Sequence, residues 1–231
     1  MGLILDGVLQ AFRLLLAGDP EVWRITLLSL RISATATLLA LAVGIPAGTL
    51  LALARFPGRA LVISLVNTGM VLPPVVVGLI VTIVLWRNGL LGALELLYTP
   101  TAMVLAQLVI AAPIVTGLTL AAVQQIPDRF RLQLLALGAS RVQMTWVLIK
   151  EARLPMLAAL MAGFGGVISE VGASMMVGGN IKGSTRVLTT ATVLETGKGN
   201  FDVAIALSVI LLAITFLVNW ALTWIQQRRR V

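Results

Sequence analysis

Long stretches without charged residues are the feature that most restricts the fold of this chain. Four of them contain no charge: residues 32–54, 60–86, 96–127 and 203–227. A fifth, residues 154–181, is interrupted only by Glu170. Each stretch is long enough to cross the hydrocarbon core of a bilayer, which takes about 20 mostly apolar residues in a helix. Because the apolar residues run continuously and do not alternate, they predict helices and not a β-barrel.

The remaining composition agrees with a chain that lives in lipid. Only 11% of the residues are charged, whereas roughly a quarter are charged in a soluble domain. We therefore expect an all-α polytopic membrane protein with five transmembrane helices. No repeat or low-complexity linker divides the sequence, so residues 1–231 are expected to form a single transmembrane domain.

The segment before the first apolar stretch has a different pattern. Apolar residues recur there at helical spacing: Leu5, Leu9, Phe12 and Leu16. Polar residues occupy the opposite face: Asp6, Gln10 and Arg13. This pattern predicts an N-terminal amphipathic helix at the membrane interface, with a frayed terminus as the alternative. The first apolar stretch begins after some 30 residues and is followed by Arg55 and Arg59, which indicates a retained helix and not a cleaved signal peptide.

The basic residues are distributed unequally between the two sets of loops. The loops 55–59 and 127–153 and the tail 228–230 hold ten of the 17 Lys and Arg residues and only two acids. The other loops hold seven basic residues and six acids. The positive-inside rule therefore predicts an outside N-terminus and a cytoplasmic C-terminus. The excess of basic residues in the cytoplasmic loops thus accounts for the net charge of +8. Because the basic residues are scattered over short loops, we expect no binding of nucleic acid.

Several kinds of chemistry are excluded by missing residue types. The chain has no Cys and no His, which removes thiolate and imidazole catalysis and the usual zinc and haem ligands. The segment 179–185 contains Gly, Lys, Ser and Thr, but Lys182 precedes Gly183, the wrong order for a phosphate-binding loop. We therefore expect a protein that is not an enzyme and that holds no cofactor or metal.

Two features within the apolar stretches suggest a transport pathway. The pair Pro73 and Pro74 lies near the middle of the second stretch, with Asn67 shortly before it. Prolines bend or break helices, and broken helices at membrane depth occur where protein or a water-filled cavity meets the freed carbonyls. Glu170 lies in the fourth stretch among small residues that include Ser174. Glu170 is interpreted either as part of a pathway or gate, or as a protonated or hydrogen-bonded packing residue.

The longest basic loop, about residues 127–153, resembles a known motif. Its central residues are Leu134, Leu135, Ala136, Leu137, Gly138, Ala139 and Ser140, and Trp146 and Pro155 follow. The loop is similar to the EAA loop of permease subunits of binding-protein-dependent ABC importers. In that family the loop forms a coupling helix that sits in a groove of the ATPase subunit. Here Leu132-Gln133-Leu134 stands where the family usually has Glu-Ala-Ala, and Lys150-Glu151 stands in place of Leu-Pro.

Two further segments narrow the resemblance to the tungstate and molybdate branch, with the tungstate permeases most similar. They are residues 72–78, with the Leu-Pro-Pro sequence, and residues 169–181, with Ser-Glu-Val-Gly-Ala and Gly-Asn-Ile. The resemblance implies a type I ABC importer permease in a prokaryotic inner membrane. It implies three partners besides the lipid bilayer: a second copy of the chain, a cytoplasmic ATPase dimer, and an extracytoplasmic oxyanion-binding protein. Asn180, Lys182 and Arg186 are then candidates for contact with the binding protein.

Alternatives of two kinds remain at this point. The same machinery could carry molybdate, sulfate or thiosulfate in place of tungstate, because these oxyanions have nearly the same geometry. A stand-alone secondary transporter or channel is the other alternative, although five spans fit poorly with the inverted repeats of many such proteins.

Overall fold

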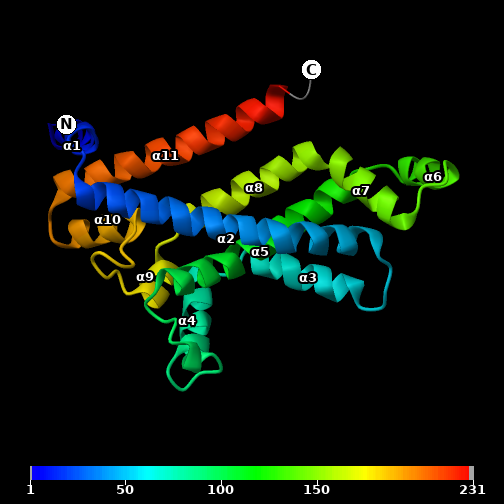
Figure 1. The fold of residues 1–231 in the computed structure, drawn as a ribbon, viewed down its shortest axis with the longest axis horizontal. Helices are drawn as coiled ribbons and strands as arrows, with labels where there is room; N and C mark the ends of the chain where they lie inside the picture. Colours follow the sequence, from blue (N-terminus) through cyan, green and yellow to red (C-terminus); the bar gives the residue numbers. More distant parts are fainter. Residues whose placement is uncertain (1, 229–231) are drawn as a thin grey trace.

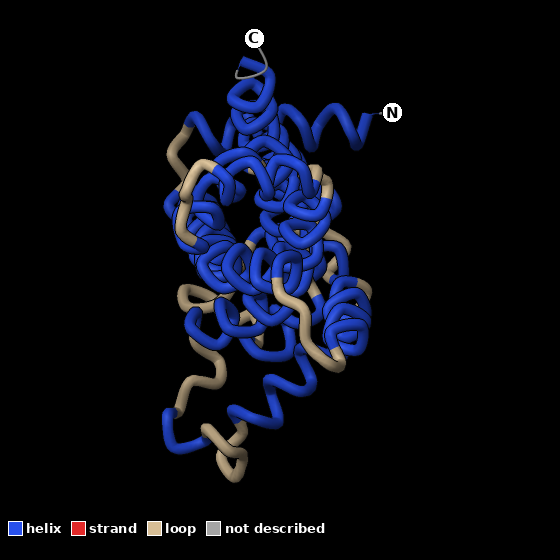
Figure 2. Tube along the Cα trace, turned by 90° about the vertical axis from the view of Figure 1, so that its right-hand side faces the viewer, coloured by secondary structure: helices blue, strands red, loops and turns tan. Residues whose placement is uncertain are grey.

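The computed structural model describes residues 2–228, apart from the side chains of residues 2–6, 14 and 15, and its described part is helical without strands (Figures 1 and 2). Three helices are long and apolar enough to cross a membrane: α2 (Pro20–Leu53), α5 (Pro100–Gln124) and α11 (Phe201–Arg228). Two further spans are bent pairs: α3 (Arg59–Met70) with α4 (Pro74–Leu85), and α8 (Arg153–Ile168) with α9 (Gly172–Gly178). If each pair counts as one span there are five, so the predicted all-α membrane fold is confirmed.

Four helices outside the spans lie at the two ends of the molecule (Figure 1). α6 (Asp128–Ala136) and α7 (Arg141–Glu151) form one end, which we call the coupling-loop end. α1 (Gly2–Leu16) and α10 (Leu188–Gly197) lie at the opposite end, and the short 3₁₀ helix η1 (Gly92–Leu94) follows α4. The end of α11 returns toward α8, where the Gln226 side chain donates a hydrogen bond to the Leu154 carbonyl at 3.3 Å. The basic loops 55–59 and 127–153 and the described end of α11 therefore lie toward the same end of the molecule.

Helices α2 and α5 form the centre of the fold through an unusually close contact. A Cβ atom added to Gly44 would lie 2.7 Å from Val115 Cγ1, and one added to Gly48 would lie 2.5 Å from the Thr116 carbonyl oxygen. Neither position has room for a side chain. Small residues let helix backbones approach within lipid, where dispersion contacts replace the hydrophobic effect as the force between helices.

The first span is longer than the sequence indicates. The apolar stretch begins at residue 32, but α2 is continuous over 34 residues and includes Arg24 and Arg31. Its N-terminus is fixed by Asp19, whose Oδ1 accepts hydrogen bonds from the backbone N–H groups of Glu21 and Val22 at 2.9 Å each. At 1.5 Å per residue the helix is about 51 Å long. This length exceeds the thickness of the hydrocarbon core, which is about 30 Å. Arg24 and Arg31 therefore lie on the part of α2 that precedes the apolar stretch.

Helix α1 packs against α11 through its small residues. Gly7 and Ala11 are buried, and a Cβ added to Gly7 would lie 2.5 Å from Ile205 Cγ2. The apolar residues Leu9, Phe12 and Leu16 are exposed on the chain, as expected for a face that meets lipid. The side chains of Leu5 and Asp6, which belong to the same predicted pattern, lie outside the described residues.

The α2–α5 contact predicts that Gly48→Ala destabilises the protein by about 1–3 kcal/mol, because the added methyl meets backbone that has no space to move. Gly165→Ala is the matched control, since nothing lies within 4 Å of a Cβ added there. The measurement is the thermal unfolding midpoint of the purified chain in detergent. Equal midpoints for the two variants would contradict the close contact.

Candidate functional site

The structure brings together the predicted break at Pro73 and Pro74 and a second helix break beside Glu170, the other residue that the sequence marks as a pathway candidate. One break lies between α3 and α4, which are bent by 102°, and the other between α8 and α9, which are bent by 58°. Beyond the breaks, α4 and α9 pack closely: a Cβ added to Gly78 would lie 2.7 Å from Ala173 Cα, and one added to Gly172 would lie 2.7 Å from Val75 Cγ2. The two half-helices are therefore packed against each other without space for a side chain at Gly78 or Gly172.

Proline chemistry accounts for the sharper of the two bends. Pro73 occupies the N-cap of α4 and Pro74 its first turn. Consecutive prolines remove two backbone donors, and each restricts the residue before it to extended conformations, so α3 cannot continue through them. Pro46 and Pro113, in contrast, lie within the unbroken helices α2 and α5.

Glu170 forms the second break through its hydrogen bonds. Its carboxylate Oε1 accepts from the backbone N–H of Ala173 at 2.9 Å, and its carbonyl oxygen accepts from the Thr189 hydroxyl at 2.9 Å. The residue is only 9% exposed. A carboxylate at the start of a helix satisfies a free N–H group and interacts favourably with the helix dipole. Glu170 thus lies directly before Val171, the N-cap of α9, and its hydrogen bonds link the first turn of α9 to α10.

Ser174 and Asn67 lie in contrasting surroundings. Ser174 is 1% exposed and its hydroxyl has no hydrogen-bond partner among the described residues. Asn67 is exposed on α3, where Ser64 and Thr68 share its face at helical spacing. We call Ser64, Asn67 and Thr68 the polar stripe. Polar side chains on a membrane span normally face a cavity or another chain, so the stripe marks the open side of α3, and its spacing is visible in the sequence.

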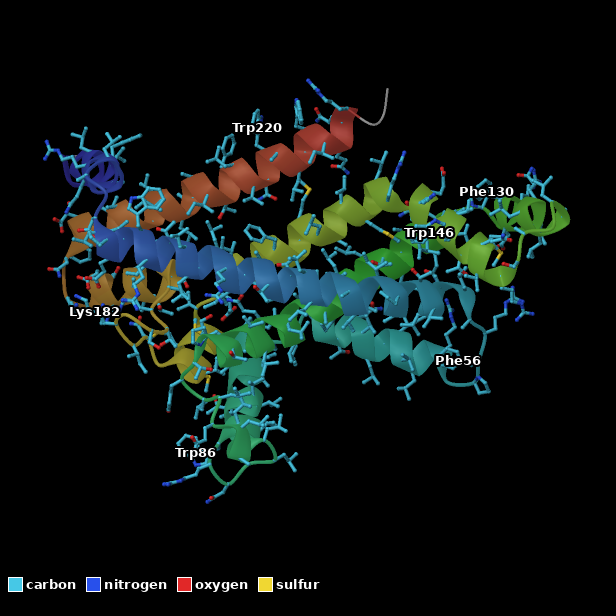
Figure 3. The ribbon with its side chains drawn as sticks, viewed as in Figure 1. Phe56, Trp86, Phe130, Trp146, Lys182 and Trp220 are labelled. Carbon is cyan, nitrogen blue, oxygen red and sulfur yellow. The ribbon has the colours of Figure 1, made fainter. Side chains whose placement is uncertain are left out.

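The three residues expected to contact a binding protein lie together at the end opposite the coupling loop. Figure 3 labels Lys182 at this end. Lys182 Nζ lies 2.7 Å from Glu21 Oε2, and Arg186 Nη1 lies 3.5 Å from Glu21 Oε1. The Asn180 amide donates to the Thr190 carbonyl at 3.3 Å. Glu21 was not a predicted site residue, and no local sequence pattern links it to Lys182 or to Arg186, which is 165 positions away. It partly neutralises both cations, so they do not form a free anion trap.

A second acid at this end fixes the turn between α10 and α11. Hydrogen bonds from Asn200 and Lys198 hold the pKa of Glu195 below its ordinary value. A lowered pKa stabilises the folded state at neutral pH, and that stabilisation is lost as the pH falls through the folded-state pKa. Lys198 is thereby also paired, at 2.7 Å.

At the coupling-loop end, Gly138 and Ser140 make a rigid helix–turn–helix of α6 and α7. Gly138 has φ of +83°, a left-handed conformation that ends α6 and that glycine adopts without strain. Ser140 begins α7 with a capping box: the Gln143 N–H donates to its hydroxyl, and the Ser140 N–H donates to the Gln143 side chain at 2.8 Å. The turn therefore has one defined geometry.

Large apolar side chains are exposed on this helix pair. We call Leu132, Leu135, Leu137, Val142 and Trp146 the apolar loop surface; Leu137 is 83% exposed and Val142 is 80% exposed. Trp146 projects from α7 in Figure 3. Leu148, on the same helix, is fully buried in a cluster with Val123 of α5 and Met156 of α8. The surface is therefore a protein-docking candidate that is anchored to two membrane helices.

Comparison with known proteins agrees with this arrangement. Residues 44–231 match the family described as binding-protein-dependent transport system inner membrane component. The chain belongs to this family. A probable anion ABC transporter permease protein of Haloferax volcanii is 43% identical over 84% of this chain and 86% of that protein. The tungstate uptake system permease protein TupB of Peptoclostridium acidaminophilum is 39% identical over 98% of this chain and 100% of that protein.

Solved structures show the same fold. An inward-facing structure of the MetNI methionine ABC transporter covers 90% of this chain and 94% of its own, with a TM-score of 0.73 and 22% identity. The chain is thus a permease subunit of an ABC importer in the inner membrane, and it is not an enzyme, because ATP hydrolysis belongs to a separate subunit. Membership of a binding-protein-dependent family also implies an ATPase partner and a substrate-binding partner.

The geometry at Glu170 predicts that Glu170→Ala lowers stability by about 1 kcal/mol, the usual cost of losing a helix cap. Glu170→Gln keeps a side-chain oxygen that accepts from Ala173, so we expect it to retain most of that stability. Thermal unfolding of both variants measures the difference. If Gln is as damaging as Ala, the negative charge and not the hydrogen bond fixes the start of α9.

Proposed function

We propose that this chain is the permease of an importer for a tetrahedral oxyanion, most specifically tungstate. The observation that carries the proposal is the near full-length similarity to a protein named as a tungstate uptake permease, at 39% identity. The relative named as a probable anion permease supports the same class of cargo. Molybdate, sulfate and thiosulfate remain the alternatives within this class.

The working unit is a pair of copies of this chain, residues 1–231 forming one transmembrane domain in each. The polar stripe on α3 favours this, because polar groups exposed on a membrane helix are satisfied when they face a shared aqueous path. The coupling-loop end faces the cytoplasm, with the N-terminus outside and the C-terminus inside, because most of the basic residues lie at that end.

The apolar loop surface is the contact with the ATPase dimer. Residues 134–140 form the end of α6 and the turn to α7, and Leu148 connects α7 to α5 and α8. When ATP closes the ATPase dimer, the helix pair moves as a rigid body and displaces these helices. The movement reaches the breaks through α8 and the close α4–α9 contact, so Pro73, Pro74 and Glu170 open or close the path together.

The pathway holds the anion weakly, so that it leaves as readily as it enters. Glu21 partly neutralises Lys182 and Arg186, which leaves the outer basic residues to contact the binding protein and to attract a dianion without trapping it. Asn180 fixes the loop that presents them. Tight recognition of the oxyanion then belongs to the binding protein.

This mechanism predicts that Gly138→Val reduces the anion imported per ATP hydrolysed by at least about tenfold, because a β-branched residue strongly disfavours positive φ. Gly138→Asn is the control, since asparagine tolerates the left-handed region. The measurement is uptake and ATP hydrolysis in vesicles that contain all subunits. Normal coupling in the valine variant, at equal protein content, would contradict a role for this turn.

Cargo and energy source are tested in the same vesicles. We expect ATP-dependent uptake of labelled tungstate that requires the binding protein and the ATPase, with unlabelled sulfate competing poorly. Stronger competition by molybdate or sulfate than by tungstate would reassign the cargo. Uptake by this chain alone, driven by an ion gradient and indifferent to ATP, would identify a secondary transporter and overturn the proposal.

A further inference from the structure

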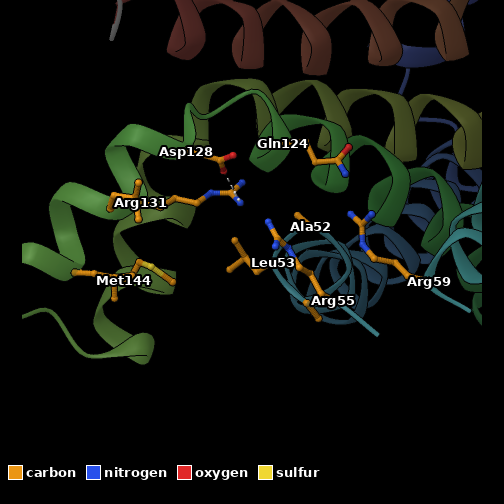
Figure 4. A pocket seen from close by; sticks show the side chains of 11 residues that line it. Ala52, Leu53, Arg55, Arg59, Gln124, Asp128, Arg131 and Met144 are labelled. Carbon is orange, nitrogen blue, oxygen red and sulfur yellow. Dashed lines mark ion pairs between the residues drawn. The ribbon is translucent and has the colours of Figure 1, made fainter. Parts of the chain in front are cut away.

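A cavity lined by arginines opens at the coupling-loop end (Figure 4). Its volume is about 670 Å³, and it lies where the ends of α2 and α5 meet α6 and the start of α3. Arg55, Arg59 and Arg131 line it, and Asp128 is the one acid in its wall. Arg55 lies in the short turn between α2 and α3 and Arg59 begins α3, whereas Arg131 comes from α6, so only the fold brings Arg131 to the other two.

Two of the arginines also hold the ends of helices. Arg59 Nε donates to the Leu51 carbonyl at 2.7 Å, and Arg131 donates to the Val123 carbonyl at 3.1 Å. Such contacts satisfy the free carbonyls at a helix C-terminus. They leave donors unused: the Nε atom of Arg131 is buried without a hydrogen-bond partner among the described residues. Capping therefore explains where the side chains of Arg59 and Arg131 lie, but it leaves the Arg131 Nε–H group without an acceptor among the described residues.

Arg55 has no structural contact of this kind. Within residues 2–228 its side chain is in no hydrogen bond or ion pair, yet it lines the same cavity. The positive-inside rule explains why this loop contains an arginine. It does not explain why Arg55 lines the same cavity as Arg59 and Arg131. Its guanidinium is free to bind a ligand.

The charges of the cavity do not balance. Three guanidinium groups face one carboxylate, and Asp128, which lies 3.4 Å from Arg131, has a side chain that is 82% exposed and therefore well solvated. A concave surface of one charge sign attracts the opposite ion. Arginine binds tetrahedral oxyanions through paired N–H donors and is the residue best suited to them.

We propose that this cavity is a binding site for a doubly charged tetrahedral oxyanion. This chemistry is shared by a free inorganic dianion and by the phosphomonoester headgroup of phosphatidic acid, and the volume accommodates either. The bound anion joins Arg131 of α6 to Arg55 and Arg59 beside α2, so it fixes the helix pair to the membrane helices. The proposal rests on the cavity and not on which anion is imported.

The test is direct binding to the full chain in nanodiscs of neutral phosphatidylcholine, with labelled tungstate as the probe. Arg55→Gln is expected to weaken binding about tenfold, the effect of losing one charge-assisted contact. Because Arg55 makes no structural contact in the described chain, this variant is expected to fold normally, as its unfolding midpoint without anion will show. Arg129→Gln is the matched control, since it removes the same charge from α6 outside the cavity wall.

A second set of nanodiscs contains phosphatidic acid and separates the two sources. Tungstate binding that depends on Arg55 in neutral lipid identifies a site for the free oxyanion. Loss of that binding in phosphatidic acid, or stabilisation by this lipid alone that Arg55→Gln removes, identifies a headgroup site. No Arg55-dependent effect of either probe, or equal effects of Arg55→Gln and Arg129→Gln, would overturn the proposal. These measurements need no ATPase or binding protein, so they are independent of the uptake experiment.

Discussion

The close approach of α2 and α5 at Gly44 and Gly48 forms the centre on which both bent spans pack. Once this pair is formed, α5 offers further close contacts to both bent spans. A Cβ added to Gly69 of α3 would lie 2.9 Å from Pro113, and one added to Gly163 of α8 would lie 3.2 Å from Val115. Lipid provides little hydrophobic force between helices, so these glycine contacts determine how the spans pack. Helix α5 is the central helix, because all four contacts involve it.

The α6–α7 pair and the two bent spans are arranged around α5. The α6–α7 pair is joined to one end of α5 through a buried cluster, and the two bent spans meet each other beside it through Gly78 and Gly172. Glu170 completes this arrangement, because its carboxylate starts α9 while its carbonyl accepts from α10. A displacement at the coupling loop therefore has a continuous packed route to the breaks, as rigid-body switching requires.

Much of this fold could be predicted from the sequence, because length and apolarity alone define a membrane span. The Pro73–Pro74 break was predicted for the same local reason. The bend at Glu170 was not, since it depends on hydrogen bonds to Ala173 and Thr189 and involves no proline. The start of α2 before Arg24 and Arg31 was also missed. A charge-free stretch indicates which residues cross the hydrocarbon core, but it does not show where the helix begins.

Sites built from distant segments were beyond sequence reasoning. Lys182 and Arg186 were predicted as contacts for the binding protein, but their ion-pair partner Glu21 lies on α2 and is found only in the three-dimensional structure. The arginine cavity is a similar case, since its residues counted in the sequence only as evidence for topology. Gly138, by contrast, was found from its place in a local motif, because the turn that needs it involves only neighbouring residues.

The proposed attachment of the apolar loop surface to the ATPase has a consequence that follows from the composition of this surface. Where related loops usually present a carboxylate, this one presents Leu132 and its apolar neighbours. An attachment made by leucine, valine and tryptophan depends on the release of water and hardly at all on charge. Such an attachment tolerates high ionic strength, which screens ion pairs, and it loosens on cooling, as hydrophobic association does.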